Sequence, residues 1–362
     1  MPPKRNNHYV PQFYLRLFGT SPALIHLYNI RTNKLISNAS IKHQCYVRRF
    51  YGKDEVIENA LADLEARSSA IIRNVINSGR LPPTNAPDRR DLLRFVAIQW
   101  LRTKSHADLS NQFVESMIRK AYEEHPDENN PYLDFVRSHV DDTVIVSMAF
   151  ADMVIASLDD LEFHLVHSGI HRTFVTSDAP VVIYNQYNQS IHIIGMLGTV
   201  NRGILLFVPL SPHYLLLLYD RGIYSPTTSG DWTQYPTDKD IENLNLLQFV
   251  FADENVYFNG MLTAPTIDIL AKKANEPRSH RRIVSEVFEE EGNSAKSQLI
   301  AGHPEIPNLR LTLSFLQIRR SARKVPYRVR ISDRYRKELP DLAYNPPFHG
   351  TKVFRPKRDK PK

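Results

Sequence analysis

The chain has 362 residues, of which 42% are hydrophobic and 23% charged, and its formal net charge is +7. This composition is typical of a globular protein and not of a disordered one, and 13 glycines are few for a Gly-rich nucleotide-binding fold. The single cysteine, Cys45, excludes an intramolecular disulfide and a zinc site built from cysteines.

The first half of the chain predicts a hairpin followed by helices. Residues 23–41 contain two strand-like runs on either side of a turn at 31–33. Gly79 and Asp88 stand where a helix end and a helix cap belong. Four segments have the apolar spacing of helices: 54–78, 89 to about 123, 131–140 and 143–160.

From about residue 161 the pattern changes to short β-prone runs separated by Gly, Asn, Pro and Ser, which predicts an antiparallel meander. Thr237 or Asp238 can then cap a further helix. The remaining predicted elements are a helix over 239–251, a strand over 255–258, a helix over 265–290 broken at Pro277, and a strand within 309–318.

We therefore expect an α+β fold with an N-terminal hairpin, a helical middle, an antiparallel β meander and a basic C-terminal tail. One large domain would cover residues 1–300, with its helical part over about 54–160 and its β part over about 161–260. Residues 301–362 would form a basic C-terminal extension.

The basic character is concentrated in the C-terminal sixth. Residues 304–362 carry 16 Lys or Arg against 5 Asp or Glu, whereas the rest of the chain has a net charge of about −4. Such a tail either binds a polyanion such as nucleic acid or only keeps the chain soluble. The side chains that a nucleic acid would contact are Arg319, Arg320, Arg323, Lys324, Arg328 and Arg330.

Targeting and membrane signals are weak. The basic N-terminus has no apolar core of the kind found in signal peptides. The most apolar stretches, 143–157 and 204–219, do not reach the roughly 20 apolar residues of a spanning helix. We expect a cytoplasmic protein without a membrane span.

The segment HYVPQFYLRLF, residues 8–18, concentrates polar and aromatic side chains. His8 can transfer a proton or bind a metal near neutral pH, and Arg16 can bind a phosphate or a carboxylate. Pro11 favours extended geometry at Val10, and the residues after it suit a strand or a short helix equally well. Alternatively, the segment docks onto the domain for stability, with its polar groups satisfied.

This opening resembles that of a bacterial family called domain of unknown function 4238, whose members begin with a His-Tyr-Val-Pro-Gln-Phe/Tyr-Tyr-Leu-Arg pattern. In similar proteins Asn often stands where this chain has Ala179, so a side-chain amide is missing there. The resemblance covers roughly residues 6–260 and implies a shared fold and site, but no established activity. The further matches are Cys45 with Tyr51-Gly52, Glu58, Glu65, Gln99 with Arg102-Thr103, Thr176-Ser177-Asp178 before Pro180, and Pro209-Leu210-Ser211-Pro212.

Several polar residues outside the opening are candidates for the same site. Glu58 and Glu65 are seven residues apart on a predicted helix and share one face, where they would bind Mg²⁺ or Mn²⁺ or lie solvated. Gln99 and Arg102 share a face of the next helix and either bridge neighbouring elements or orient a ligand.

Ser177 and Asp178 follow a predicted strand. Asp178 can bind a metal or act as a base, and Ser177 lacks the Gly-x-Ser-x-Gly elbow of a nucleophile. Alternatively, both side chains stabilise a local turn.

The first functional hypothesis is a metal-assisted nuclease-like phosphodiesterase acting on nucleic acid. In a bacterium such an enzyme would suit anti-phage defence, with another protein of the defence system as its partner. Its metal ligands would be Glu58, Glu65 and Asp178. The rest of the site would be His8 as proton carrier, Arg16 and Arg102 as neutralisers of charge, and Tyr14, Gln99 and Ser177 as further polar groups.

The second hypothesis is a non-enzymatic sensor, adaptor or binding module of a defence or stress system. The same polar side chains would then line a ligand pocket or stabilise the fold. Convergence of His8, Glu58, Glu65 and Asp178 on one open cleft favours the enzyme. Burial of these residues in satisfied pairs favours the module.

Overall fold

The computed structural model describes residues 6–52, 56–112, 115, 143–169, 171–189, 198–229, 232–233, 236–279, 283–290, 298–304, 307–322 and 354–356. The helices are α1 (Gln12–Arg16), η1 (Ile41–His43, a 3-10 helix), α2 (Val56–Ser78), α3 (Pro87–Leu101), α6 (Thr143–Ala149), α7 (Ala151–Leu158), α8 (Asp238–Phe251) and α9 (Ala264–Ser279). The strands of the two four-stranded sheets are β2 (Leu24–Asn29), β3 (Lys34–Ser40), β5 (Glu162–His167), β6 (Thr176–Ser177), β7 (Val182–Tyr184), β8 (Leu205–Pro209), β9 (Tyr214–Tyr219) and β13 (Asn255–Phe258).

The remaining strands form smaller sheets. They are β1 (Asn6–His8), β4 (Tyr46–Arg48), β10 (Tyr224–Pro226), β11 (Thr228–Ser229), β12 (Trp232–Thr233), β14 (Ile283–Glu290), β15 (Gln298–Pro304), β16 (Leu316–Ile318) and β17 (Phe354–Pro356). Every described strand pair is antiparallel, so the α+β fold class predicted from the sequence is confirmed.

The central sheet has the strand order β5-β9-β8-β7 and is buried on both faces. In β9, Leu216 and Leu218 point into one hydrophobic core, and Leu215 and Leu217 point into the other. Successive side chains of a strand point to opposite faces, so an apolar run such as YLLLLY is typical of a strand that is covered on both sides.

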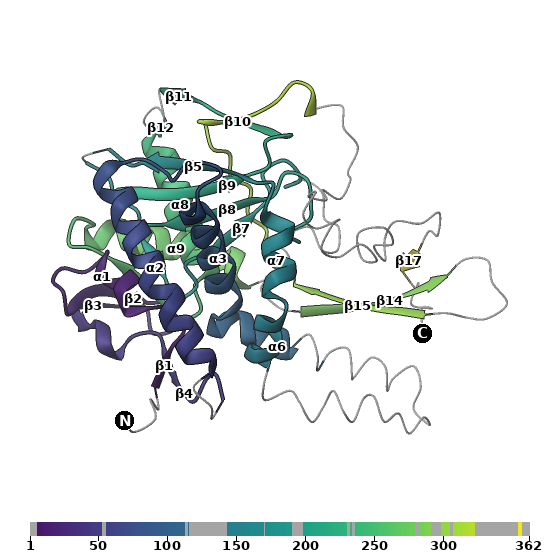
Figure 1. The fold of residues 1–362 in the computed structure, drawn as a ribbon, viewed down its shortest axis with the longest axis horizontal. Coiled ribbons are helices and arrows are strands. Elements are labelled where there is room, and N and C mark those ends of the chain that lie inside the picture. Colours follow the sequence, from purple (N-terminus) through teal and green to yellow (C-terminus); the bar gives the residue numbers. More distant parts are fainter. Residues whose placement is uncertain are drawn as a thin grey trace.

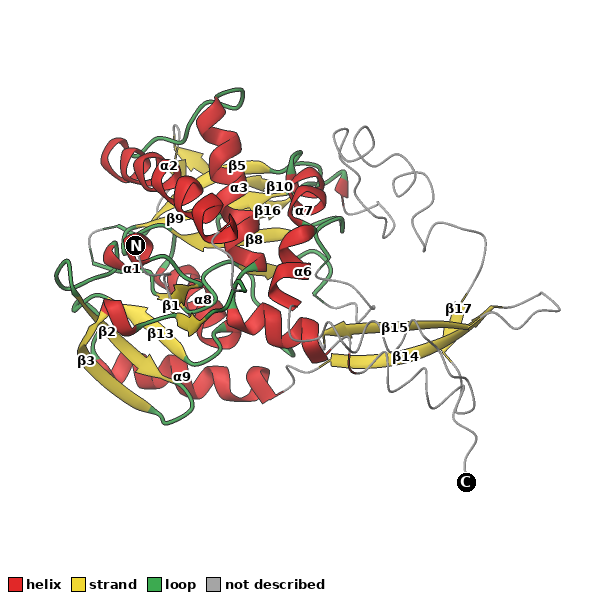
Figure 2. Ribbon diagram, turned by 60° about the horizontal axis from the view of Figure 1, so that its bottom comes forward, coloured by secondary structure: helices red, strands yellow, loops and turns green. Residues whose placement is uncertain are grey.

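Helices cover both faces of this sheet. Helices α2, α3 and α7, with the short α1, pack on the first core, whereas α8 and α9 pack on the second (Figures 1 and 2). The second four-stranded sheet has the order β3-β2-β13-β6, and its two faces contribute to the same two cores. Leu27 and Tyr257 belong to the first core, and Tyr28 and Val256 belong to the second.

Local signals in the sequence located several elements correctly. The predicted hairpin is β2–β3, and Asn33 adopts a positive φ of 53° in its turn. Helix α2 ends before Gly79, which has a φ of 64°. Helix α8 begins with a capping box, in which Thr237 and Asp240 bond each other's backbone N–H groups.

Tertiary interactions overrode the local pattern elsewhere. The helix predicted from 89 to about 123 is interrupted at Arg102, and helical structure resumes at residues 104–112 because Thr103 caps a new turn. The helix predicted over 143–160 is divided at Phe150 into α6 and α7. The helix predicted over 131–140 lies outside the described residues.

Two further predictions need correction. Strand β6 does not join the meander; it pairs with β13 in the other four-stranded sheet. Residues 283–290 form strand β14, paired with β15, and not the end of a helix over 265–290. Strand β6 is thus determined by a partner about 80 residues away in sequence, and β14 by the strand that follows it in the chain.

Part of the predicted C-terminal extension packs in the second core. Leu311, Leu313, Phe315 and Leu316 are buried there, and β16 pairs with β10. No helix within the described residues is both long and apolar enough to cross a membrane.

Tyr14 joins the opening segment to both four-stranded sheets. Its side chain is fully buried, and its hydroxyl lies 3.0 Å from Thr176 Oγ1 in β6 and donates to the carbonyl of Pro209 in β8. We expect Tyr14→Phe to lower the free energy of unfolding by about 1–3 kcal/mol, because two buried polar groups lose a partner.

Urea unfolding of the intact protein measures this loss. Tyr46→Phe is the matched control, since Tyr46 is 39% exposed and should tolerate removal of its hydroxyl. Equal stability of the two variants would contradict the role assigned to Tyr14.

Candidate functional site

The backbone of the opening segment is held by side chains beneath it. Asn7 Nδ2 donates to Glu58 Oε2 of α2 at 2.9 Å, and Gln99 Nε2 of α3 donates to the Tyr9 carbonyl oxygen at 2.9 Å. The Tyr51 hydroxyl donates to the His8 carbonyl oxygen at 3.4 Å. These bonds dock the segment onto α2 and α3.

A buried arginine orients this network. Arg102 is 1% exposed, and its Nε and Nη2 donate to Gln99 Oε1 at 3.0 and 2.8 Å, while Nη1 donates to Glu65 Oε1 at 2.8 Å. Because Arg102 occupies the amide oxygen of Gln99, the amide NH₂ must face the Tyr9 carbonyl. Of the two roles predicted for Gln99 and Arg102, the observed contacts match the bridging of neighbouring elements.

On the outer side of the segment, three side chains at i, i+4 and i+8 form a second row. Arg16 Nη2 donates to Gln12 Oε1 at 2.9 Å, and Gln12 Nε2 lies 3.2 Å from His8 Nε2. Since the Gln12 oxygen accepts from Arg16, its NH₂ faces His8, which assigns the proton of the neutral imidazole to Nδ1. We call His8, Gln12 and Arg16 the outer row.

The electrostatic surroundings favour this neutral imidazole. Burial is the largest influence on His8 and lowers its pKa, against the carbonyl of Lys42 and the charges of Glu65 and Glu58, which raise it. The Lys42 carbonyl oxygen lies 3.3 Å from Nε2 and would accept a hydrogen bond from Nε2 if that nitrogen were protonated. His8 therefore changes its hydrogen-bond donors when it changes protonation state.

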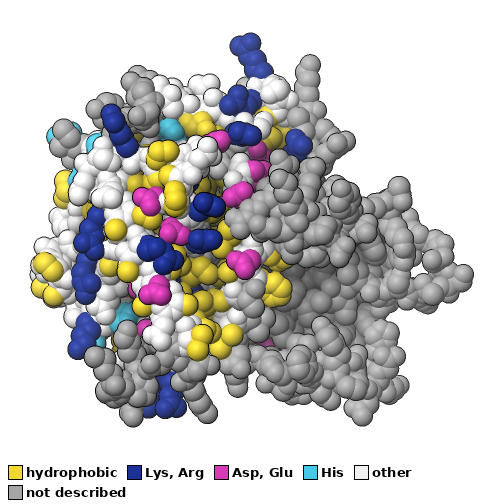
Figure 3. All heavy atoms as spheres, viewed as in Figure 1, with side chains coloured by type: hydrophobic (Ala, Val, Ile, Leu, Met, Phe, Trp, Pro, Cys, Tyr) yellow, Lys and Arg dark blue, Asp and Glu magenta, His cyan; other side chains and the backbone are white. Residues whose placement is uncertain are grey.

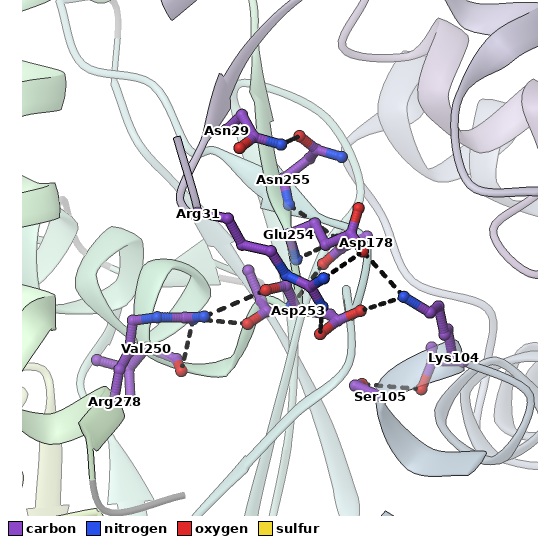
Figure 4. A network of polar contacts seen from close by, with 12 residues as sticks. Asn29, Arg31, Lys104, Ser105, Asp178, Val250, Asp253, Glu254, Asn255 and Arg278 are labelled. Atoms are coloured by element: carbon purple, nitrogen blue, oxygen red, sulfur yellow. Dashed lines mark hydrogen bonds and ion pairs between the residues drawn. The ribbon is translucent and has the colours of Figure 1, made fainter. Parts of the chain in front are cut away.

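Asp178 belongs to a different network. Its carboxylate is fully buried and accepts three backbone N–H bonds, from Asp253 at 2.8 Å, Glu254 at 2.7 Å and Asn255 at 2.8 Å (Figure 4). The Asp178 N–H in turn donates to the Asn255 carbonyl oxygen at 3.1 Å. These bonds fix the loop between α8 and β13 and hold β6 beside β13.

Cations fix the same loop from outside. Lys104 and Arg31 each pair with the carboxylates of Asp253 and Glu254, at 2.9–3.2 Å. Arg278 reaches the loop from the side opposite Lys104 and donates to backbone carbonyls at the end of α8 and to that of Asp253 (Figure 4). The exposed Arg31 pairs are weakly stabilising, whereas the half-buried Arg278 satisfies carbonyls that a helix end leaves free.

Ser177 is also engaged by protein groups. Its fully buried Oγ donates to Gln248 Oε1 at 2.7 Å and accepts the Ala179 N–H at 3.2 Å. The second contact is the local turn expected as an alternative to a catalytic role.

The structure thus divides the predicted site residues into two groups. The network around the opening segment contains His8, Arg16, Glu58, Glu65, Gln99 and Arg102. The strands and the loop behind it are contacted by Tyr14, Ser177 and Asp178. The groups adjoin at Tyr9, whose ring lies within electrostatic range of Asp178.

The predicted metal ligands each have a protein partner: Asn7 for Glu58, Arg102 for Glu65 and backbone amides for Asp178. Among the described residues, no three His, Cys, Asp or Glu side chains are placed so that they could hold one metal ion. Glu58, Glu65 and Asp178 are therefore not brought together as such a group.

The predicted nucleic-acid contacts lie only partly within the described chain. Arg319 is docked on β10, where its Nε donates to the Tyr224 carbonyl oxygen at 3.0 Å, and Arg320 is exposed. The others, Arg323, Lys324, Arg328 and Arg330, lie outside the described residues.

Gln12 was not selected from the sequence, although it links His8 to Arg16. Part of the signal was present: Gln12 and Arg16 are four residues apart, which places them on one side of a helical turn. It was missed because the sequence left extended and helical geometry equally open for residues 11–18.

The architecture and the docked polar segment define a mixed α+β protein with antiparallel sheets and a rigidly held N-terminal signature. A family model described as "Protein of unknown function (DUF4238)" matches residues 6–260, more than two thirds of the chain, and the chain belongs to this family. No curated protein and no solved structure matches the chain.

Removing the Arg102 guanidinium should disrupt the docking network. We expect Arg102→Leu to lower the free energy of unfolding by about 3 kcal/mol, because Glu65 and Gln99 lose their donors within the fold. Glu65 is 28% exposed, so water can partly hydrate its carboxylate in the variant. The loss of stability should therefore be at the low end of the range seen when one partner of a buried ion pair is removed.

Denaturant unfolding of Arg102→Leu, Glu65→Gln and the double variant tests this coupling. Because the two side chains share one bond, the double variant should lose less than the sum of the single losses. Strict additivity would contradict the network.

Asp178 should make stability depend on pH. Burial raises the pKa of its carboxyl from 3.8 to about 6, although the three N–H bonds oppose the shift. Since the folded state holds this proton more tightly than the unfolded state, the stabilisation is complete below about pH 4 and is lost as the pH rises to about 6, a loss of about 3 kcal/mol.

The comparison is between the protein and Asp178→Asn, whose side chain has no charge to bury. The stability advantage of the unchanged protein over the variant should shrink by about 3 kcal/mol between about pH 4 and about pH 7. Asp63→Asn, at an exposed position of α2, serves as the control. An advantage that does not vary with pH would disprove the shifted ionisation.

Proposed function

We propose that this protein is a non-enzymatic binding module and that its outer row, His8, Gln12 and Arg16, contacts an anionic partner. The observation that carries the proposal is the two-sided character of the opening segment. Its inner groups are bonded to α2 and α3, whereas the outer row forms a hydrogen-bonded chain at the surface. Such a rigid base with a polar surface suits recognition.

The state of the predicted catalytic groups supports a module over a phosphodiesterase. Glu65 is paired with Arg102, and Asp178 is fully buried beneath three backbone donors. Groups bonded in this way are arranged to hold the fold, and rearrangement would be needed before they could act on a substrate.

The polarity of the outer row supports an anionic partner. Arg16 is exposed, and Nη1 of its guanidinium has no hydrogen-bond partner among the described residues. With its proton on Nδ1, His8 is a second donor of the outer row. A guanidinium and a neutral imidazole N–H together present donors to a phosphate, sulfate or carboxylate.

Chromatography on immobilised heparin, a polyanion, tests the proposal. We expect Arg16→Ala to elute at lower salt than the unchanged protein, because one contact to the anion is lost. Arg90→Ala is the matched control, since Arg90 is an exposed arginine of α3 away from the outer row. Equal elution of Arg16→Ala and the unchanged protein would contradict the assignment of the contact surface.

The enzymatic alternative has its own test. Purified protein is incubated with single-stranded and duplex DNA and RNA in Mg²⁺ or Mn²⁺, and we expect no hydrolysis. Cleavage that is abolished by His8→Ala or Glu58→Ala would reject the non-enzymatic module in favour of a nuclease.

A further inference from the structure

The first 52 residues carry a charge asymmetry that the net charge of the chain conceals. They contain eight Lys or Arg and no Asp or Glu, whereas residues 53–303 contain 22 Lys or Arg and 34 Asp or Glu. The N-terminal region thus has a net charge of +8 and the middle of the chain a net charge of −12. A surface region that carries charges of one sign attracts partners of the opposite sign.

Within the part of the chain that the structure describes, most of this positive charge has no carboxylate partner. The six described cations of the region are Arg16, Arg31, Lys34, Lys42, Arg48 and Arg49. Within the described residues, Arg31 is the member of this set that pairs with carboxylates, those of Asp253 and Glu254. All six side chains are exposed.

Three of the unpaired cations border a two-stranded ribbon. Strands β1 and β4 pair antiparallel, with Asn6 opposite Arg48 and His8 opposite Tyr46. Asn7 and Val47, between these pairs, face inward, where Asn7 bonds Glu58 and Val47 packs on the first core. Because side chains alternate along a strand, the outward face consists of Asn6, His8, Tyr46 and Arg48, which we call the ribbon surface.

The ribbon surface has aromatic groups at its centre. Tyr46 is 39% exposed, and its ring centroid lies 5.9 Å from that of the half-buried His8. Helix η1 adjoins the ribbon, since the Lys42 carbonyl oxygen lies 3.3 Å from His8 Nε2, and the outer row continues from His8 to Arg16. The exposed ring of Tyr46 thus shares a face with Arg48, and its neighbour His8 connects it to Lys42 and to the outer row with Arg16.

The space-filling view agrees with this charge distribution. Lys and Arg side chains follow the edge of the molecule where α1, β2 and β3 lie, and others mark the end where β1 and β4 lie (Figure 3). In the middle of the same face, over α2 and α3, Asp and Glu side chains alternate with Lys and Arg side chains (Figure 3). The edge formed by the first 52 residues differs from this mixed surface, because it carries cations without acids.

We infer that the ribbon surface, together with Arg16 and Lys42, binds single-stranded nucleic acid. This inference rests on the proposed function and names its partner class. Proteins that bind single strands combine cations along the backbone with aromatic rings on which bases stack. A duplex keeps its base faces stacked and would offer only phosphates, leaving Tyr46 without a role.

Fluorescence anisotropy of labelled oligonucleotides of about 20 nucleotides tests the inference on the full-length protein. We expect single-stranded dT or rU to bind more tightly than a duplex of the same length. Tyr46→Ala should weaken single-strand binding roughly tenfold, whereas Tyr46→Phe, which keeps the ring, should bind within about twofold.

Charge substitutions give an independent readout. The variant Lys42→Ala/Arg48→Ala should reduce the slope of log affinity against log salt by about 1.4, since each single-strand phosphate contact contributes about 0.7. Phe150→Ala, at a 52% exposed aromatic outside the ribbon surface, and Arg90→Ala are the matched controls and should bind like the unchanged protein.

Photo-crosslinking of iodouridine-labelled RNA, followed by peptide mapping, locates the contact directly. Crosslinks in 42–48 support the inference. Crosslinks confined to 319–362, equal affinity for duplex and single strand, or unchanged binding by Tyr46→Ala would overturn it. If Arg16→Ala still lowers heparin retention in that case, the proposed function stands and only its partner class is rejected.

Discussion

The buried guanidinium of Arg102 is the constraint on which the docking of the opening segment depends. A charged side chain that is 1% exposed must have its N–H groups paired, and Glu65 and Gln99 provide the partners. Apolar residues of similar volume are often as stabilising as a buried ion pair. What Arg102 adds is direction, since it turns the Gln99 amide toward Tyr9 and so fixes which face of the segment looks outward.

Asp178 is a second buried charged group whose hydrogen bonds must be satisfied within the fold. Among the described residues no cation bonds its carboxylate, which accepts hydrogen bonds from three successive backbone N–H groups and so fixes the course of the loop after α8. That course brings β13 between β2 and β6. One buried acid therefore determines how a two-residue strand, β6, leaves the meander and joins a sheet whose other strands come from both ends of the family region.

The sequence predicted those parts of the fold whose cause is local. Thr237 with Asp240, and Gly79 after an apolar repeat, are signals within one helical turn, and α8 and α2 were located from them. The break after α3 could not be predicted, because Arg102 leaves the helix to meet Glu65, 37 residues away. At the site, sequence proximity identified His8 and Arg16 but could not show that Asp178 belongs to a separate network.

The two-sided opening segment explains why residue types that suggest catalysis occur here without a complete catalytic group. Its inner polar atoms must be satisfied wherever a backbone crosses a helical layer, and Asn7, Tyr9 and Gln99 meet that need. His8 and Arg16 are not needed for this docking. They belong to the outer row, and the cations Lys42 and Arg48 near His8 have no carboxylate partner among the described residues. Exposed ion pairs contribute little to stability, so stability alone does not determine whether such cations have acidic neighbours. Under the proposed function, these cations would contact a negatively charged partner.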